Sequence, residues 1–418
     1  MPKISIKERD LTTNAIATAV DQYILYVLPQ SVSVIDTNNP SLNKELKNLL
    51  TDINAKSGAP REMSSLEAEA VELVDLNHKF LTECIRLGGR VIAALNWEQA
   101  ANYCGDRNQY DIKYILVDEV ADEEGVAAEQ KDLEFALAIA EKRKDCVILL
   151  NAVSTRLQKN TEKLCEEQLG YITPASDNFF RDEKQIKKGK YVFPFFAKGG
   201  LHKVSNPDIY IKANEAFVEA FLNNLNQGRP EGLTVAGAIN GVIPNDYEVD
   251  GVLKEDEIDA MQPKEYSKDG QIIAVNPICN IHEFGTRIWG NRTALPNDCV
   301  LDDTGHPGVN GTDQRVATSF ANVRIAINRI KKAMYKSSRR YQFEQNSDVL
   351  WVNFKSSINV LLEELKQSNI ISGYRWQRLE TPARATLRAD LQVVPVEGTE
   401  DFLLGVELDD NLNAEIAE

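Results

Sequence analysis

The spacing of apolar residues predicts two long amphipathic helices in the last hundred residues. Apolar side chains recur every three or four positions over 316–334 and again over 351–365, which is the period of one helix face. The first stripe comprises Val316, Phe320, Val323, Ile327, Ile330 and Met334, and the second comprises Trp351, Phe354, Ile358, Leu361 and Leu365. Asn346 and Ser347 are suitable caps for the second helix, and Gly373 interrupts the chain after it.

Helical and extended patterns alternate between residues 40 and about 260. Short apolar runs at 90–95, 112–118 and 146–153 predict buried strands. Helical patterns stand at about 133–140 and 213–225, and the segment 232–243 continues the series. Such alternation is typical of helices packed on a mainly parallel sheet. The sequence therefore predicts a mixed α/β fold.

Both ends of the chain have extended patterns. Residues 1–35 alternate in places, and the first dozen have too little apolar surface for a domain. A free arm of some 15 to 20 residues reaches about 50 to 65 Å, enough to contact another molecule. At the other end, 391–397 and 401–408 predict a strand pair around Gly398, with Pro395 favouring an edge position.

Composition narrows the classes of function. A formal charge of −16 and a pI near 4.9 argue against general affinity for nucleic acid or anionic membranes, which would repel the chain. The sequence has neither an apolar run long enough to span a bilayer nor a secretion signal at its start, so we expect no membrane insertion and folding in a cytoplasm. The six scattered cysteines predict reduced thiols.

The motifs of common enzymes are missing from the sequence. It contains no P-loop, GxSxG or HExxH motif and only four histidines, so we predict no catalytic or cofactor-binding residue. The nearest approach to a zinc site is Cys279, His282, Cys299 and His306, but their spacing favours unconnected side chains, and no metal is predicted. We therefore expect a protein that is not an enzyme. A soluble acidic α/β enzyme of unknown reaction is the alternative.

Charge is segregated along the chain. Between Asp313 and Glu344 there are eight basic residues and no acid, whereas nine acids and no base follow Arg388. Two interpretations stay open. These stretches are solvated faces, or the basic helix meets an acidic partner while the acidic end pairs with another copy, since opposite charges set register and speed encounter.

The run AVNPICNIHEFGTRIWGNRTALPN at 274–297 resembles the signature of contractile tail sheath proteins. The resemblance rests on Asn276, Gly285, Trp289, Gly290, Arg292 and Thr293, and it continues in order through Phe343, Asn346 and Trp351. A turn at Gly373 and Tyr374, a Thr-Pro pair and two closing strands complete it. The match is specific over 232–408 and loose over 36–230. The chain departs from the family at 244–256, where an aromatic-Lys-x-Pro-Ala segment often stands.

The resemblance implies a sheath-type core domain with an inserted α/β domain and extended arms that pair with neighbouring subunits. The expected division is 1–35 for the amino-terminal arm and first core strands, 36–230 for α/β structure, 231–389 for the core, and 390–418 for the carboxyl-terminal strand arm and acidic tail. The residues expected in the arms are Ile4, Ile6, Leu11, Leu391, Val393, Leu403 and Val406. Trp289 and Trp351 are expected in the core.

The resemblance also implies a mechanical function. Sheath subunits form stacked hexameric rings, a helical polymer around a tail tube, and contract to drive the tube through the target envelope. The implied partners are other copies, the tail tube protein, and baseplate and tail terminator proteins, without direct nucleic acid contact. The expected location is a virion tail assembled in the host bacterial cytoplasm. A bacteriophage tail is favoured; a phage-tail-like bacteriocin, an injection system and a non-contracting wall stay open. Arg324, Arg329, Lys331 and Lys332 are the candidates for tube contact.

Overall fold

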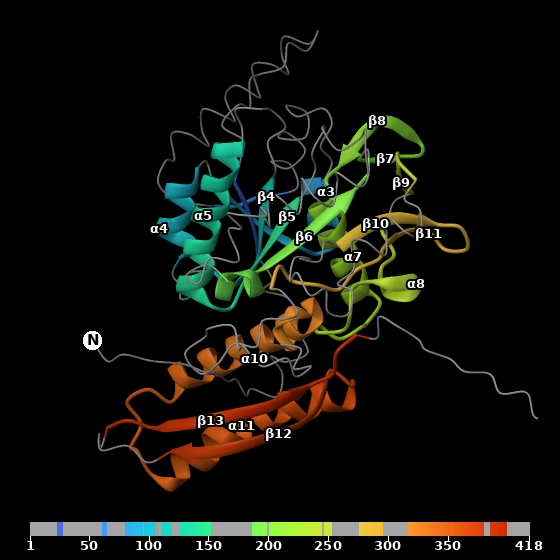
Figure 1. Ribbon diagram of the computed structural model, residues 1–418. Helices are drawn as coiled ribbons and strands as arrows, with labels where there is room; N and C mark the ends of the chain where they lie inside the picture. The colour runs from blue at the N-terminus through green and yellow to red at the C-terminus, as the bar shows by residue number, and fades with distance from the viewer. Residues whose placement is uncertain are drawn as a thin grey trace, which may run out of the picture.

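The computed structural model places an α/β body beside a smaller unit of two helices and a β-ribbon (Figure 1). The structure describes residues 23–27, 61–64, 80–94, 96–105, 107, 110–118, 126–151, 186–198, 200–244, 246–252, 276–295, 317–379 and 385–398. The arm residues Ile4, Ile6, Leu11, Leu403 and Val406 lie outside these ranges.

An eight-stranded sheet forms the centre of the body. Its strands in spatial order are β11 (Gly285–Ile288), β10 (Asn276–Ile281), β6 (Val192–Ala197), β5 (Val147–Asn151), β4 (Ile112–Asp118), β1 (Tyr23–Val27), β3 (Arg90–Ala94) and β2 (Arg61–Glu62). The six inner strands are parallel, and the edge strands β2 and β11 are antiparallel to their neighbours. This confirms the predicted mixed α/β class.

Strand β1 lies in the interior of the sheet. Leu25 is paired with Ile92 of β3 on one side and with Ile115 of β4 on the other. The far end of the sheet is formed by β10 and β11, about 250 residues later in the chain. The sheet therefore combines a strand from before residue 35, strands from between 35 and 230, and strands from after 230. The predicted domain limits at residues 35 and 230 stay predictions.

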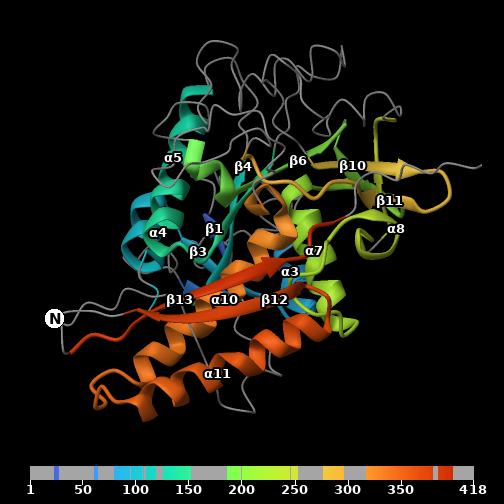
Figure 2. The ribbon, with the colours of Figure 1, turned by 60° about the horizontal axis from the view of Figure 1, so that its bottom comes forward.

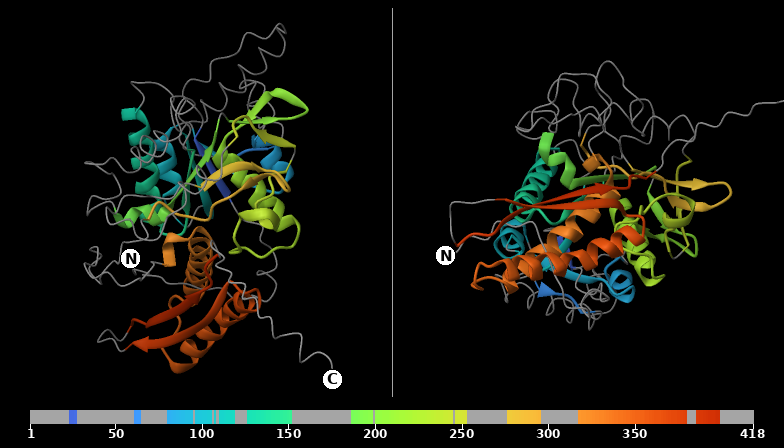
Figure 3. Two further views of the ribbon diagram at one scale, coloured as in Figure 1. Left: turned by 45° about the vertical axis from the view of Figure 1, so that its right-hand side comes forward. Right: turned by 90° about the horizontal axis from the view of Figure 1, so that it is seen from below.

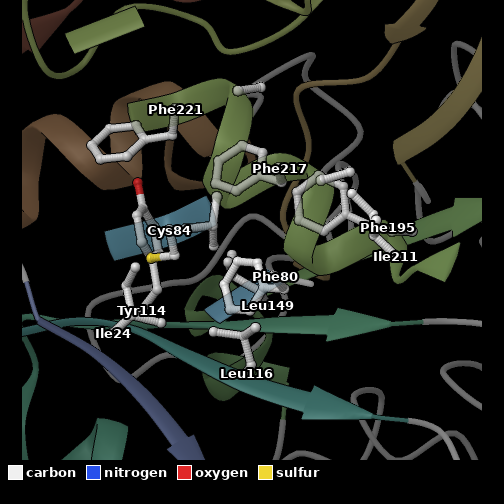
Figure 4. Close-up of a cluster of buried hydrophobic side chains, with 14 of the residues drawn as sticks. Ile24, Phe80, Cys84, Tyr114, Leu116, Leu149, Phe195, Ile211, Phe217 and Phe221 are labelled. Carbon is white, nitrogen blue, oxygen red and sulfur yellow. The ribbon is translucent and has the colours of Figure 1, made fainter. Parts of the chain in front are cut away.

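Helices cover both faces of the sheet. On one face lie α3 (Phe80–Arg86) and α7 (Ala213–Asn226), and on the other α4 (Trp97–Cys104) and α5 (Val126–Arg143). Figure 4 shows Tyr114 of β4 facing α7, where its ring centroid lies 5.7 Å from that of Phe217 and 5.1 Å from that of Phe221. The sheet strands are buried because both faces are packed, which explains their continuous apolar runs.

Smaller elements complete the body. The strands β7 (Leu201–Lys203), β8 (Asn206–Ile211) and β9 (Tyr247–Val249) form a three-stranded sheet. Two short 3-10 helices span Ile186–Tyr191 and Ala317–Ser319. The segment 232–243 was expected to continue the α/β series, but it forms only the short helix α8 (Gly237–Asn240) and isolated bridges.

The smaller unit consists of α10 (Ala321–Arg340), α11 (Asp348–Gln367), β12 (Ile371–Leu379) and β13 (Arg388–Pro395). Figures 1 and 3 show α10 between the body and the rest of this unit. Most of the predicted apolar stripes are confirmed, because Val323, Ile330, Met334, Phe354, Ile358, Leu361 and Leu365 are all buried. Ile327 and Trp351 are partly buried, Phe320 is buried just before α10, and Val316 lies outside the described residues. Ser347 caps α11, its hydroxyl oxygen accepting from the Leu350 amide at 3.2 Å.

The predicted turn at Gly373 and Tyr374 is wrong. Both residues belong to β12, which lies beside β13 (Figure 2). The two strands are antiparallel, and Tyr374 pairs with Val393. Segment 391–397 therefore pairs with β12, which precedes it in the chain. Its predicted partner, 401–408, lies outside the described residues. In the described part of the chain the ribbon has two strands, so each has one edge without a strand beside it.

Candidate assembly surfaces

One basic face of α10 lies against the starts of parallel strands in the body. The Lys332 Nζ atom is 2.5 Å from Asp111 Oδ1 and donates to the Ile112 carbonyl at 2.8 Å. The Lys336 Nζ atom is 3.1 Å from Asp111 Oδ2. Burial alone would raise the pKa of the Asp111 carboxyl, but the two ammonium groups lower it to about 2. Asp111 therefore stays ionised and holds α10 against β4.

A second contact joins α10 to the turn before β5. The Arg324 guanidinium lies 4.4 Å from the centroid of the Tyr191 ring and donates to the Lys144 carbonyl at 3.3 Å. Lys331 donates to the same carbonyl at 3.1 Å. Arg324 is only 2% exposed, and its burial lowers its pKa. The guanidinium is thus held by an aromatic face and a backbone oxygen.

A chain of ionic contacts connects the body to α11 through α10. Lys113 forms an ion pair with Glu231, and Arg329 donates to the Glu231 carbonyl at 3.3 Å and to Glu364 Oε1 at 2.7 Å. Burial lowers the pKa of Lys113 to about 8 despite the opposing effect of Glu231. Burial would raise the pKa of Glu231, yet Lys113 and Arg329 lower it. Both partners are charged near neutral pH.

These contacts place the four candidate tube-contact residues within the molecule. Arg324, Lys331 and Lys332 contact the body, and Arg329 bridges to α11. Each of these four side chains contacts a backbone carbonyl or a carboxylate of the same chain. Tube contact stays a prediction. The exposed cations of α10 are those of its last turns, Lys336, Arg339 and Arg340.

The signature residues near Asn276 form a joint inside the body. The Asn276 amide donates to the carbonyls of Pro194 and Arg292 at 2.8 Å each, and its oxygen accepts from the Arg292 amide at 2.7 Å. A Cβ atom on Gly290 would lie 2.7 Å from the Cα atom of Asn276, so only glycine fits there. Gly285, the first residue of β11, has a φ of 72°.

The joint continues into the start of α10. The buried Arg292 guanidinium lies 4.0 Å from the centroid of the Phe320 ring, and Thr293 donates to the Thr318 carbonyl at 3.0 Å. Asn322, in the first turn of α10, accepts from Asn291 at 2.8 Å and donates to the Val396 carbonyl at 3.0 Å. These residues therefore connect the sheet, the helix and the end of the ribbon.

The later signature residues lie in and after the connection between α10 and α11. Trp351 is partly buried and packs on Phe354 and Trp376, with centroid distances of 6.3 and 5.8 Å. Trp289 is likewise partly buried against the second core cluster of the body. Phe343 is 86% exposed with a φ of 74°, and Asn346 donates to the Thr386 carbonyl at 3.4 Å. Sequence patterns did not predict the exposure of Phe343.

The described arm residues Leu391 and Val393 pack on the helices from β13 and are partly buried there. They anchor the ribbon to its own unit while its outer edge stays open among the described strands. An open edge of this length presents backbone groups that another strand can pair with.

The described residues show no arrangement that holds a metal ion. No three side chains of His, Cys, Asp or Glu come close enough there, and Cys279 is buried while Cys299 and His306 lie outside the described ranges. Cys84, Cys104, Cys146 and Cys279 are free and buried. Among the described helices, none combines the length and apolar character required to cross a bilayer.

Comparisons with known proteins decide the fold. No family model matches the sequence, and no curated protein matches it either. Among solved structures, a chain of the PVC sheath complex of an extracellular contractile injection system, in the contracted state, superposes with a TM-score of 0.61. That match covers 98% of each chain at 13% sequence identity. The chain has the fold of a contractile sheath protein.

Two further solved structures agree with this sheath fold. A chain of the anti-feeding prophage baseplate, 6-fold symmetrised, matches with a TM-score of 0.56 at 14% identity, covering 98% of this chain and 97% of the other. A chain of the same baseplate in its contracted state matches with a TM-score of 0.54 at 12% identity over 99% of both. The resemblance drawn from the signature is thereby confirmed at the level of the fold.

Proposed function

We propose that this chain is the structural subunit of a contractile sheath. Many copies polymerise as stacked six-membered rings around an inner tube and rearrange into a wider, shorter lattice that drives the tube through a target envelope. The observation that carries this proposal is the likeness to a sheath complex over 98% of both chains, which leaves no large part of the fold unaccounted for. The chain is not proposed to catalyse a reaction or to hold a cofactor.

The ribbon supports a mode of assembly. Its open edge fits strand addition, in which main-chain hydrogen bonds join an extended segment of one molecule to the sheet of another. Ile4, Ile6 and Leu11 at one end and Leu403 and Val406 at the other are the proposed donors, with Leu391 and Val393 holding the acceptor ribbon in place.

The ionic contacts of α10 support movement of each subunit as one piece. An ion pair with Asp111 and hydrogen bonds to the carbonyls of Lys144 and Glu231 join α10 to the body, while Arg329 joins α10 to Glu364 of α11, so the two parts resist displacement relative to each other. A change in the lattice then occurs by rearrangement of the contacts between subunits. The proposed partners are other copies, a tube protein, and baseplate and terminator proteins, in a tail-like assembly built in a bacterial cytoplasm.

Electron microscopy of the purified protein and of whole particles tests the proposal. We expect rings or tubes from the purified chain, and a wider and shorter sheath after brief exposure of particles to urea. A diameter that is unchanged by urea would indicate a static wall, and a small closed oligomer or monomer at all concentrations would contradict the proposal.

A further inference from the structure

One face of α11 is exposed and carries no charge over about three turns. The exposed residues from 349 to 360 are Val349, Val352, Asn353, Ser356 and Val360. The three valines are, in chain order, 68%, 56% and 44% exposed. Figure 2 shows α10 and the ribbon on the other side of this helix. These five residues form the outer face of α11.

The composition of the outer face is unusual for a helix surface in water. Exposed helix faces ordinarily carry charged residues, as the described part of α5 does at Glu134 and Lys142. Valine is also a weaker helix former than Ala, Lys or Glu, because its branched side chain loses rotamer freedom in a helix. Exposed valines therefore weaken α11 and gain little packing in the isolated subunit. Depletion of charge is instead typical of the core of an interface.

Charge returns at the two ends of α11 with opposite sign. The side chain of Asp348 is 91% exposed at the first residue of the helix, where it accepts from Arg378, and Lys366 is exposed in the last turn. Their separation of 18 residues corresponds to about five turns, so both lie on the same side of the helix. Glu363, also exposed, accepts from the Tyr374 hydroxyl. An antiparallel copy of α11 places its Lys366 beside Asp348 and its Asp348 beside Lys366.

The outer face is complementary to a second copy of itself. Ser356 is midway between Val352 and Val360, so a two-fold axis beside Ser356 brings Val352 of one copy against Val360 of the other. The small serine lets the two helices approach closely at this point. Helices that pack nearly antiparallel, about 20° apart, keep their axes about 8 to 10 Å from each other and stay in contact along such a face.

We infer that the unassembled subunit forms a two-fold dimer through the outer faces of two α11 helices, with ion pairs between Asp348 and Lys366 at both ends. A second copy fits this face because two chains that each carry a charge of −16 repel each other, and here they meet without like charges at the centre. Five side chains from each copy bury much less than the roughly 800 Å² per partner of a standard stable interface. The dimer is therefore weak and reversible.

The dimer has a consequence for assembly, and this consequence rests on the proposed function. A two-fold axis turns the two copies in opposite directions, whereas a helical polymer adds every subunit in the same direction. The dimer has to dissociate before its subunits join the polymer. It thus stores subunits reversibly and raises the concentration at which polymer begins to form.

A disulfide across the two-fold axis tests the geometry. Because Cα atoms lie about 2.3 Å from a helix axis, the two Ser356 Cα atoms are about 3.4 to 5.4 Å apart, which overlaps the range of disulfides. Oxidised S356C should therefore run as a covalent dimer on a denaturing gel, and this dimer should not polymerise until it is reduced.

Q367C provides the matched control for S356C. Gln367 is also exposed on α11, but its two copies lie about 33 Å apart in the dimer, so Q367C should stay monomeric. Oxidised wild type gives the background from the native cysteines. Equal yields of covalent dimer from S356C, Q367C and wild type would overturn the inference.

Charge exchange tests the ion pairs at the ends of the dimer. D348K and K366E should each raise the Kd of the dimer roughly tenfold, measured by sedimentation equilibrium below the concentration at which polymer forms. The double variant D348K/K366E again places opposite charges beside each other between copies, so its Kd should return towards the wild-type value. A double variant with a Kd no lower than that of either single variant would contradict the antiparallel pairing.

Replacement of Val352 separates the dimer from other uses of the outer face. V352D places a carboxylate against Val360 of the other copy and should raise the Kd of the dimer more than tenfold. Its polymer should begin to form at a lower concentration than that of the wild type, because the store of dimers is lost. V352D chains that polymerise normally alone but no longer surround tubes would assign the outer face to the tube protein and overturn the inference.

The two proposals fail in different ways. Wild-type protein that forms the S356-centred dimer but never polymerises would contradict the proposed function alone. Wild-type protein that polymerises, yet is monomeric at every lower concentration, would contradict the dimer alone.

Discussion

Lys332 of α10 and Asp111, the residue before β4, form an ion pair 2.5 Å long between segments 221 residues apart. The Asp111 carboxylate also accepts from Lys336, and both its oxygens are thereby used. The side chain of Lys332 is only 14% exposed and that of Asp111 22%, so water screens this pair weakly. One carboxylate thus binds two lysines of α10, and its charge contributes to holding the helix on the body.

Acid should weaken the subunit through Asp111. Its pKa is about 2 in the folded chain against an ordinary 3.8, so the native state favours the ionised form. The stabilisation is fully present above about pH 4 and disappears as the pH falls towards 2; the shift corresponds to about 2 kcal/mol. Urea unfolding of unassembled protein between pH 2 and 6 measures it. At pH 6 the free energy of unfolding of D111N should be lower by that amount, and it should fall less than that of the wild type between pH 6 and pH 2. Parallel pH dependences for the two proteins would refute this.

Substitution of Arg324 should damage folding before it affects assembly. R324E places a carboxylate against the Tyr191 ring and the Lys144 carbonyl in a nearly closed site, so we expect a loss of about 3 to 5 kcal/mol. R340E, at the exposed end of the same helix, should change the free energy of unfolding by less than about 1 kcal/mol. The midpoints of urea unfolding test this, and we expect a clearly lower midpoint for R324E than for R340E. Equal midpoints would mean that Arg324 is not held as described.

Gly290 and Gly373 should respond differently to the same added methyl group. G290A brings a Cβ atom to 2.7 Å from the Cα atom of Asn276 and forces the joint apart, at a cost of about 1 to 3 kcal/mol. At Gly373 the position of a Cβ atom is open, so G373A in β12 should be neutral or slightly stabilising. Melting temperatures provide the comparison. A melting temperature of G290A at or above that of G373A would show that the backbone around Asn276 shifts to accommodate the added methyl group.

Replacing one partner of the Lys113–Glu231 pair should lower the free energy of unfolding more than replacing both. K113M leaves the Glu231 carboxylate buried without its ammonium partner, and we expect a loss of about 3 kcal/mol or more. The double variant K113M/E231Q removes both charges and should recover at least half of that loss. A double-mutant cycle of urea unfolding measures the coupling. Strictly additive losses would argue against the buried pair.

Local patterns predicted much of this fold because their signals lie within a few neighbouring residues. The apolar runs containing Ile115 and Ile148 became buried strands, and the stripes containing Met334 and Leu361 became the buried faces of α10 and α11. Strand β12 was missed because it begins four residues after α11 ends, and its Gly373 and Tyr374 suggested a turn. Tyr374 instead pairs with Val393 across the ribbon, and its hydroxyl donates to Glu363 of α11, which no local pattern specifies.

The orientation of the basic helix could not be predicted from its own residues. Arg324, Lys331 and Lys332 have helical spacings of seven and eight and therefore share one face, so the sequence could predict that they point the same way. Their partners, Asp111 and the Lys144 carbonyl, are about 200 residues away and meet them only through the tertiary fold. A basic stripe in sequence thus indicates an acidic or carbonyl-rich counterpart, and the fold supplied one from the same chain.

The interior place of β1 sets how the subunit withstands force. Five consecutive residues, Tyr23 to Val27, are paired on one side with β3 and in part on the other with β4, both parallel to β1. Tension applied through the chain preceding Tyr23 acts along the strand and shears two rows of hydrogen bonds at once, instead of peeling them open one by one. A pull on that part of the chain would therefore load three paired strands inside the sheet at once.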